Sequence, residues 1–225
     1  MASNVDGAIV LKSDPGVEEV GFDTGIELDD GRTLRAPDVS VGPLERAPGW
    51  SRTAPPLALE YADRGQDERE SQAKIADLLG AGTRWVWLVR LTGLQRVEVY
   101  EARRKMRVVG LDEVLTAPGV LKNPVLARSL VDSKAATQAT LRNLLNREGY
   151  DGLEAVVEFG KAEGKAEGSA AGKVHAALTV LATRGVAISD DLRRRLEACR
   201  DEATLDRVIV ACVTVARADD LPLPR

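Results

Sequence analysis

The chain has 225 residues, of which 44% are hydrophobic, 29% charged and 4% aromatic, as in an ordinary soluble globular protein. This composition excludes collagen-like, disulfide-scaffold and fully disordered chains. Because 31 Lys and Arg residues stand against 35 Asp and Glu residues, any nucleic-acid site must be a local basic patch. Two cysteines and one histidine exclude a disulfide framework and the usual zinc sites. No apolar run approaches the roughly 20 residues that span a membrane, and we expect a cytoplasmic protein.

Residues 1–132 alternate short apolar runs with turns rich in Gly, Pro and Asp, which is typical of strands. We expect such strands at residues 8–11, 20–27, 35–41, 56–62, 85–89, 96–102 and 105–109. Asp29, Asp30 and Gly31 predict a hairpin turn. Residues 66–80 carry apolar side chains at helical spacing and predict a helix. The expected fold class is α/β (α+β), with a mixed sheet flanked by helices.

From about residue 133 the sequence becomes Ala-rich and helical. Glycines recur every four residues from Gly160 to Gly172, so on a helix they form one slowly drifting stripe. This stripe either packs closely against another backbone or belongs to a weak helical linker. Three further helices are expected at 174–183, 190–199 and 205–216, with Ser189 as an N-cap. We therefore predict a domain over 1–132, a helical linker over 133–173 and an all-helical bundle over 174–225.

Two acidic residues interrupt otherwise apolar strands. Asp38 lies in the run Ala-Pro-Asp-Val-Ser-Val, and Glu60 lies in Leu-Ala-Leu-Glu-Tyr-Ala. Buried carboxylates need partners, and two that converge provide the oxygen ligands that Mg²⁺ or Mn²⁺ prefers. Lys74 follows on the predicted helix, at the edge of the face that packs on the sheet. A cation there would orient a nucleophile or stabilise developing negative charge.

These runs, in this order, together with the Gly-Thr-Arg-Trp-Val-Trp-Leu-Val stretch from Gly82 and the later Val-Glu-Val-Tyr, resemble the Uma family of restriction-endonuclease-like proteins. That family belongs to the PD-(D/E)XK nuclease superfamily. The resemblance covers about residues 20–130 and implies that Asp38 and Glu60 are metal ligands. The superfamily usually places Lys two residues after the second acid, where this chain has Ala62, so Lys74 would be the relocated catalytic lysine. Glu18, Glu19 and Glu27 are all candidates for a further acidic ligand.

These residues and the resemblance imply two alternative functions, and the resemblance alone implies DNA as the substrate. The first is a Mg²⁺- or Mn²⁺-dependent endonuclease that hydrolyses DNA phosphodiester bonds, with Asp38 and Glu60 as metal ligands and Lys74 assisting the attacking water. The basic cluster 103–107 would contact phosphates, unless it is simply a solvated turn. The second is a catalytically inactive nuclease fold that serves as a binding or assembly module through its helical tail. In either case we expect a homo-oligomer formed by the C-terminal helices, and no membrane partner.

Overall fold

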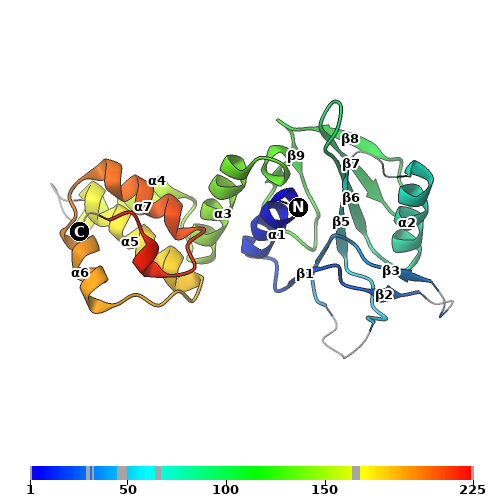
Figure 1. The fold of residues 1–225 in the computed structure, drawn as a ribbon. Helices are drawn as coiled ribbons and strands as arrows, with labels where there is room; N and C mark the ends of the chain where they lie inside the picture. Colours follow the sequence, from blue (N-terminus) through cyan, green and yellow to red (C-terminus); the bar gives the residue numbers. More distant parts are fainter. Residues whose placement is uncertain are drawn as a thin grey trace. The chain divides into compact units, whose positions relative to one another are not determined.

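The computed structural model describes residues 2–28, 31, 33–44, 50–63, 67–163 and 168–223. The chain forms two compact units, residues 1–136 and 137–225 (Figure 1). Among the described residues, no helix is long and apolar enough to cross a membrane.

A six-stranded mixed sheet forms the centre of the first unit, with the strand order β1-β4-β5-β6-β7-β8. These strands are β1 (Val20–Phe22), β4 (Val39–Val41), β5 (Leu57–Ala62), β6 (Trp85–Arg90), β7 (Arg96–Glu101) and β8 (Arg107–Gly110). Strands β5 and β6 are parallel, and every other neighbouring pair is antiparallel. Two small antiparallel pairs accompany the sheet. Strand β2 (Ile26–Glu27) pairs with β3 (Leu34–Arg35), and β9 (Val114–Leu115) pairs with β10 (Val125–Leu126). Strand β10 is followed directly by the 3-10 helix η1 (Ala127–Leu130). The predicted mixed sheet is confirmed.

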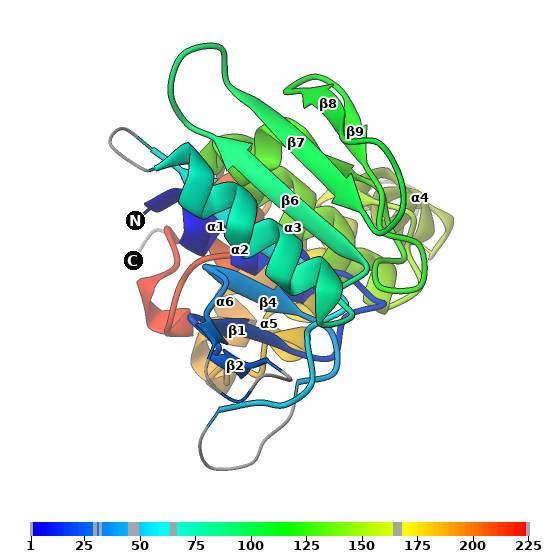
Figure 2. The ribbon, with the colours of Figure 1, turned by 90° about the vertical axis from the view of Figure 1, so that its right-hand side faces the viewer.

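Helices α1 (Ala2–Ser13) and α2 (Glu68–Gly80) cover opposite faces of this sheet (Figures 1 and 2). Helix α2 begins at its N-cap Asp67, whose side chain accepts a hydrogen bond from the Arg69 N–H. Its buried residues Ile75 and Leu78 pack against the alternate residues of β5 and β6 that point to this face, Ala58, Ala62, Val86 and Leu88. Tyr61 points to the opposite face of the sheet, the one that α1 covers. Its hydroxyl fills the space that a Cβ at Gly7 of α1 would need. Glu60 therefore lies on the face that α2 covers.

The prediction of a strand at residues 8–11 is wrong, because these residues belong to α1. Ala8, Val10 and Leu11 are almost fully buried, and a short apolar run of this kind fits a buried helix as well as a strand. The strand predicted over 20–27 is divided into β1 and β2 by Asp23, whose φ of +46° interrupts the extended backbone. The strand predicted over 35–41 is likewise divided, because Pro37 lies between β3 and β4. Of the predicted hairpin turn, Asp29 and Asp30 lie outside the described residues, and Gly31 has a φ of +61°.

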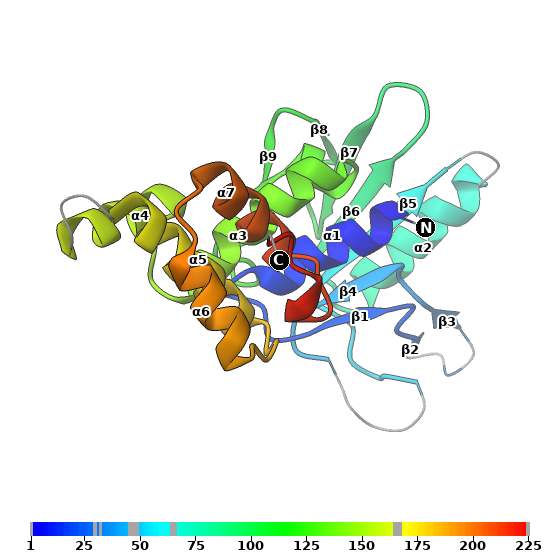
Figure 3. The same cartoon turned by 60° about the vertical axis from the view of Figure 1, so that its left-hand side comes forward.

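The second unit is helical (Figure 3). It contains most of α3 (Ser133–Arg147), followed by α4 (Leu153–Glu163), α5 (Gly168–Thr183), α6 (Asp190–Ala198), α7 (Glu202–Cys212) and the 3-10 helix η2 (Ala218–Asp220). Helix α5 packs along both α4 and α7. The core combines Leu145 and Val156, from the segment predicted as a linker, with residues of α5, α6 and α7. Ser189 is the N-cap of α6, as predicted, and accepts a hydrogen bond from the Leu192 N–H at 3.3 Å.

The glycine stripe lies only partly in the described chain, because residues 164–167 fall outside it. Its last member, Gly172, lies against the backbone of α4. A Cβ at this position would stand 2.9 Å from the Val157 Cα and 3.0 Å from the Val156 carbonyl oxygen, too close for ordinary contact. At Gly172, therefore, the glycine serves close packing between two helix backbones.

Candidate functional site

Acidic residues occupy one row that crosses the sheet on the face covered by α2. Glu60 of β5 is paired in register with Leu88 of β6, and Leu88 is paired with Glu98 of β7. Paired residues on neighbouring strands project to the same face of a sheet. Leu88 belongs to the apolar cluster beneath α2. This row therefore carries two carboxylates that are separated by one apolar side chain.

Asp38 joins this row from the start of β4. The pairing of β4 with β5 begins at Val39 and Leu59, so Asp38 stands one residue outside the ladder, next to Glu60. Its Oδ2 accepts a hydrogen bond from the backbone N–H of Tyr61 at 2.7 Å. The carboxylate thus takes the place of a main-chain acceptor on β4, which fixes its position beside Glu60.

Lys74 reaches the row from α2. Its Nζ donates a hydrogen bond to Oε2 of Glu60 at 2.8 Å, and the two side chains are 24% and 11% exposed. The second carboxylate oxygen, Oε1, is buried and has no hydrogen-bond partner among the described residues. The structure therefore brings Asp38, Glu60 and Lys74 together and leaves one buried carboxylate oxygen unsatisfied.

The proton affinity of Glu60 is strongly raised. Burial raises the pKa of the Glu60 carboxyl to about 7, although the charge and hydrogen bond of Lys74 lower it. Repulsion from Asp38 and from Asp23 raises this pKa further. A carboxyl whose charge is only partly compensated in this way gains from an additional cation.

The donor set fits a hard divalent cation held by few protein ligands. Two carboxylates, one of them with an unsatisfied buried oxygen, suit Mg²⁺, which keeps several water ligands and uses only one or two carboxylates. In the described part of the chain, no three His, Cys, Asp or Glu side chains converge closely enough to hold a metal by themselves. Water and substrate oxygens would therefore complete the coordination.

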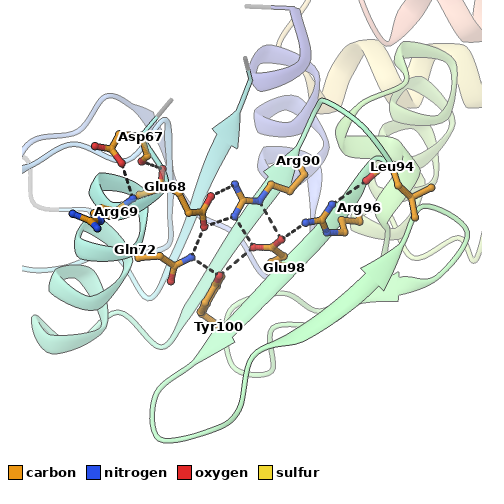
Figure 4. A network of polar contacts seen from close by, with 10 residues as sticks. Asp67, Glu68, Arg69, Gln72, Arg90, Leu94, Arg96, Glu98 and Tyr100 are labelled. Atoms are coloured by element: carbon orange, nitrogen blue, oxygen red, sulfur yellow. Dashed lines mark hydrogen bonds and ion pairs between the residues drawn. The ribbon is translucent and has the colours of Figure 1, made fainter. Parts of the chain in front are cut away.

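A second polar network lies on the same face, beyond Leu88 (Figure 4). Its centre is Glu98, which is 4% exposed and accepts hydrogen bonds from Arg90, Arg96 and the Tyr100 hydroxyl. Arg90 also forms two parallel hydrogen bonds of 2.8 Å to Glu68 of α2. The charges of the two acids and the two arginines compensate each other. Through Arg90, the network attaches the start of α2 to β6 and β7.

Sequence reasoning missed this network. Burial alone would raise the pKa of Glu98, but the hydrogen bonds and charge of Arg90, together with the hydrogen bonds of Tyr100 and Arg96, lower it below its usual value. Arg96, Glu98 and Tyr100 occupy alternate positions of β7, separated by Val97 and Val99. This alternation of polar residues is the signal by which the network could have been found.

The basic cluster that was predicted to contact phosphates is exposed, whereas the aromatic side chain of Trp87 is buried. Residues 103–107 are all exposed and connect β7 to β8, where Arg103 has a φ of +63°. Arg104 forms an ion pair of 3.2 Å with Glu101. Trp87 is fully buried, so it packs in the core and is unable to stack on a base.

No known family model matches the chain, and no curated protein matches it. Among solved structures, it is similar to a proposed nuclease belonging to DUF820 from Anabaena variabilis ATCC 29413, with 19% sequence identity and a TM-score of 0.51. The match covers 60% of this chain and 80% of that one. The expected membership of the Uma family stays a prediction. The likeness confirms the expected fold class: the chain has a mixed sheet flanked by helices, in a nuclease-like fold.

Proposed function

We propose that the protein is a metal-dependent endonuclease that hydrolyses DNA phosphodiester bonds. The observation that carries this proposal is the environment of Glu60, a buried carboxyl between Asp38 and Lys74 with one unsatisfied oxygen. The nuclease-like fold supports the same reaction class. Fold alone does not define activity, so the proposal depends on these side chains.

Each of the three residues has a distinct role in this proposal. Asp38 and Glu60 hold Mg²⁺ or Mn²⁺, and such an ion supplies Lewis-acid chemistry that neutralises a phosphodiester and activates water. The ammonium group of Lys74, already directed at Glu60, orients the attacking water and compensates negative charge that develops on the phosphate. The exposed basic turn 103–107 adds phosphate contacts that carry no sequence information.

The test is cleavage of supercoiled and linear DNA in the presence of Mg²⁺, Mn²⁺ or EDTA. We expect metal-dependent cutting by the parent protein, and its loss in Asp38→Asn and Glu60→Gln, since both variants keep the shape of the side chain while removing a carboxylate oxygen. Glu70→Gln is the matched control, because Glu70 is an exposed acid on the same helix as Lys74. Absence of cutting by the parent with every metal and DNA form would contradict the proposal.

The alternative is an assembly module built on an inactive nuclease fold. Ala62, at the position where the superfamily usually has Lys, favours it, and so do the exposed apolar side chains Phe159 and Val210 in the second unit. Self-association through the C-terminal helices is expected under both proposals. Light scattering of residues 1–136 beside the full chain tests it, and an equal oligomeric state for the two would exclude the helical unit as the assembly element.

A further inference from the structure

A third acidic residue continues the row that contains Asp38 and Glu60. The last pair between β1 and β4 is Phe22 with Val39, and the corresponding pair between β4 and β5 is Val39 with Leu59. One residue beyond these pairs, Asp23 follows β1 at the position opposite Asp38, and Asp38 in turn precedes β4 at the position opposite Glu60. Neighbouring strands are roughly 4.8 Å apart, so the three carboxylates fall within a span that one hydrated cation bridges.

The charge balance of this row is strongly negative. Lys74 is paired with Glu60 at 2.8 Å, whereas no Lys or Arg in the described chain forms an ion pair with Asp23 or Asp38. Among the residues that the structure describes, three carboxylates therefore share one ammonium group. The negative charge of Asp23 acts on Glu60. Burial and repulsion from Asp38 raise the pKa of Glu60, and repulsion from Asp23 raises it further.

A separate observation shows that the row contains a buried oxygen atom whose hydrogen-bonding capacity is unused. Glu60 is only 9% exposed, and its Oε1 has no hydrogen-bond partner among the described residues. A buried carboxylate oxygen without a partner is costly unless a cation or a water molecule satisfies it. Since Lys74 already occupies Oε2, the ligand would approach from the side of Oε1.

We propose that Asp23 is the third acidic residue of the candidate metal site, where it accepts hydrogen bonds from water bound to the divalent cation. This inference rests on the proposed function, because it concerns the same ion. Binding through water agrees with the finding that no three acidic side chains of the described chain form a closed cage. Mg²⁺ and Mn²⁺ retain water ligands readily, and residues that hold those waters affect metal affinity.

The structure separates Asp23 from the other acidic candidates nearby. Glu19 lies at the opposite end of β1, where its carbonyl oxygen accepts a hydrogen bond from the Gly42 N–H. Glu27 belongs to the small β2–β3 pair and lies 3.9 Å from Arg52. Glu18 is exposed and precedes the strand. Of these acids, only Asp23 stands in the register position beside Asp38.

The experiment measures Mn²⁺ binding to the full chain by calorimetry and by water-proton relaxation, without DNA. Four variants are compared with the parent protein: Asp23→Asn, Asp23→Gly, Asp38→Asn and Glu18→Gln. Both Asn and Gly tolerate the φ of +46° at position 23, so each variant removes the carboxylate without straining the backbone. Glu18→Gln is the control for loss of one negative charge from the same region.

We expect Asp38→Asn to abolish binding, both Asp23 variants to weaken it about tenfold or more, and Glu18→Gln to leave it unchanged. If the Asp23 variants bind Mn²⁺ as tightly as the parent while Asp38→Asn does not, Asp23 has no part in the site and the proposed function stands. If Glu18→Gln weakens binding as much as Asp23→Asn, the effect is general electrostatics and the inference fails. A parent protein that binds no Mn²⁺ overturns the proposed function and this inference together.

Discussion

The ammonium nitrogen of Lys74 lies 2.8 Å from Oε2 of Glu60, across the contact between α2 and β5. Even so, burial outweighs this pairing, and the pKa of Glu60 is raised to about 7. The folded protein thus binds a proton at Glu60 more tightly than the unfolded chain does. This relationship has consequences for stability, for metal binding and for catalysis.

The first prediction concerns stability and pH. Below the ordinary carboxyl pKa of 4.5, Glu60 is neutral in both the folded and the unfolded protein. Between pH 4.5 and about 7, Glu60 ionises only in the unfolded chain, so folding becomes less favourable as the pH rises. Over the whole titration, the free energy of unfolding of the parent protein falls by about 3 kcal/mol. Glu60→Gln lacks this titration, so its free energy of unfolding should gain about that amount relative to the parent between pH 5 and pH 8. Urea unfolding measures it, and a difference independent of pH would contradict the raised pKa.

The second prediction separates the role of Lys74 from metal binding. Lys74→Met should lower the rate of DNA cleavage about 100-fold or more at saturating Mg²⁺, because the positive charge near the reacting phosphate is lost. The variant should still bind Mn²⁺, since Asp38 and Glu60 remain. Calorimetry and plasmid cleavage of the same preparations test both parts. Full activity in Lys74→Met would exclude Lys74 from the reaction.

The third prediction concerns the network around Glu98. Its lowered pKa means that its contribution to stability is present above the ordinary carboxyl pKa and is lost as the pH falls through the folded-state value. Glu98→Ala should cost about 3 kcal/mol near pH 7, because it leaves Arg90 and Arg96 without their buried partner.

Glu68→Gln is the matched comparison, as Glu68 is bonded to the same Arg90 but its side chain is 59% exposed. We expect it to cost at most about 1 kcal/mol. Chemical denaturation of both variants gives the two values. Equal costs would mean that burial does not determine the strength of this network.

The fourth prediction tests the helix contact at Gly172. Gly172→Ala should destabilise the second unit by about 1–3 kcal/mol, because the new Cβ meets backbone atoms of Val156 and Val157 that have no freedom to rotate away. Gly152→Ala is the control, since its nearest neighbour is the flexible carboxylate end of Glu154 at 3.4 Å. Thermal unfolding of the two variants should differ clearly. A neutral Gly172→Ala would show that α4 and α5 separate without cost.

Sequence patterns were sufficient for the mixed character of the sheet and for placing Lys74 at the edge of the helix face that packs on it. The apolar strand at 85–89 and the helix at 66–80 have strong periodicity, and the helix register directs Lys74 at β5. Helix α1 was missed because its short apolar run lacks a clear period. Arg90 and Glu98 belong to different strands, and only the pairing of β6 with β7 brings them together.

The position of Asp23 also depended on register. Its local sequence suggests only a strand, whereas the turn that it forms and its alignment with Asp38 follow from how β1 pairs with β4. Such pairings between distant segments leave no mark on the sequence of either one. Site residues gathered by a sheet are therefore harder to predict than those gathered by a helix.

Leu88 separates two carboxyls whose pKa values are shifted in opposite directions, that of Glu60 upward and that of Glu98 downward. When the pH falls from 8 to 5, Glu60 takes up a proton and the negative charge that would hold a cation decreases. Glu98 stays ionised over the same range and continues to bind Arg90, which anchors α2 through Glu68. Under the proposed function, mild acid should therefore release a bound metal ion while the helix that carries Lys74 stays in place, so that neutralising the solution restores metal binding without refolding.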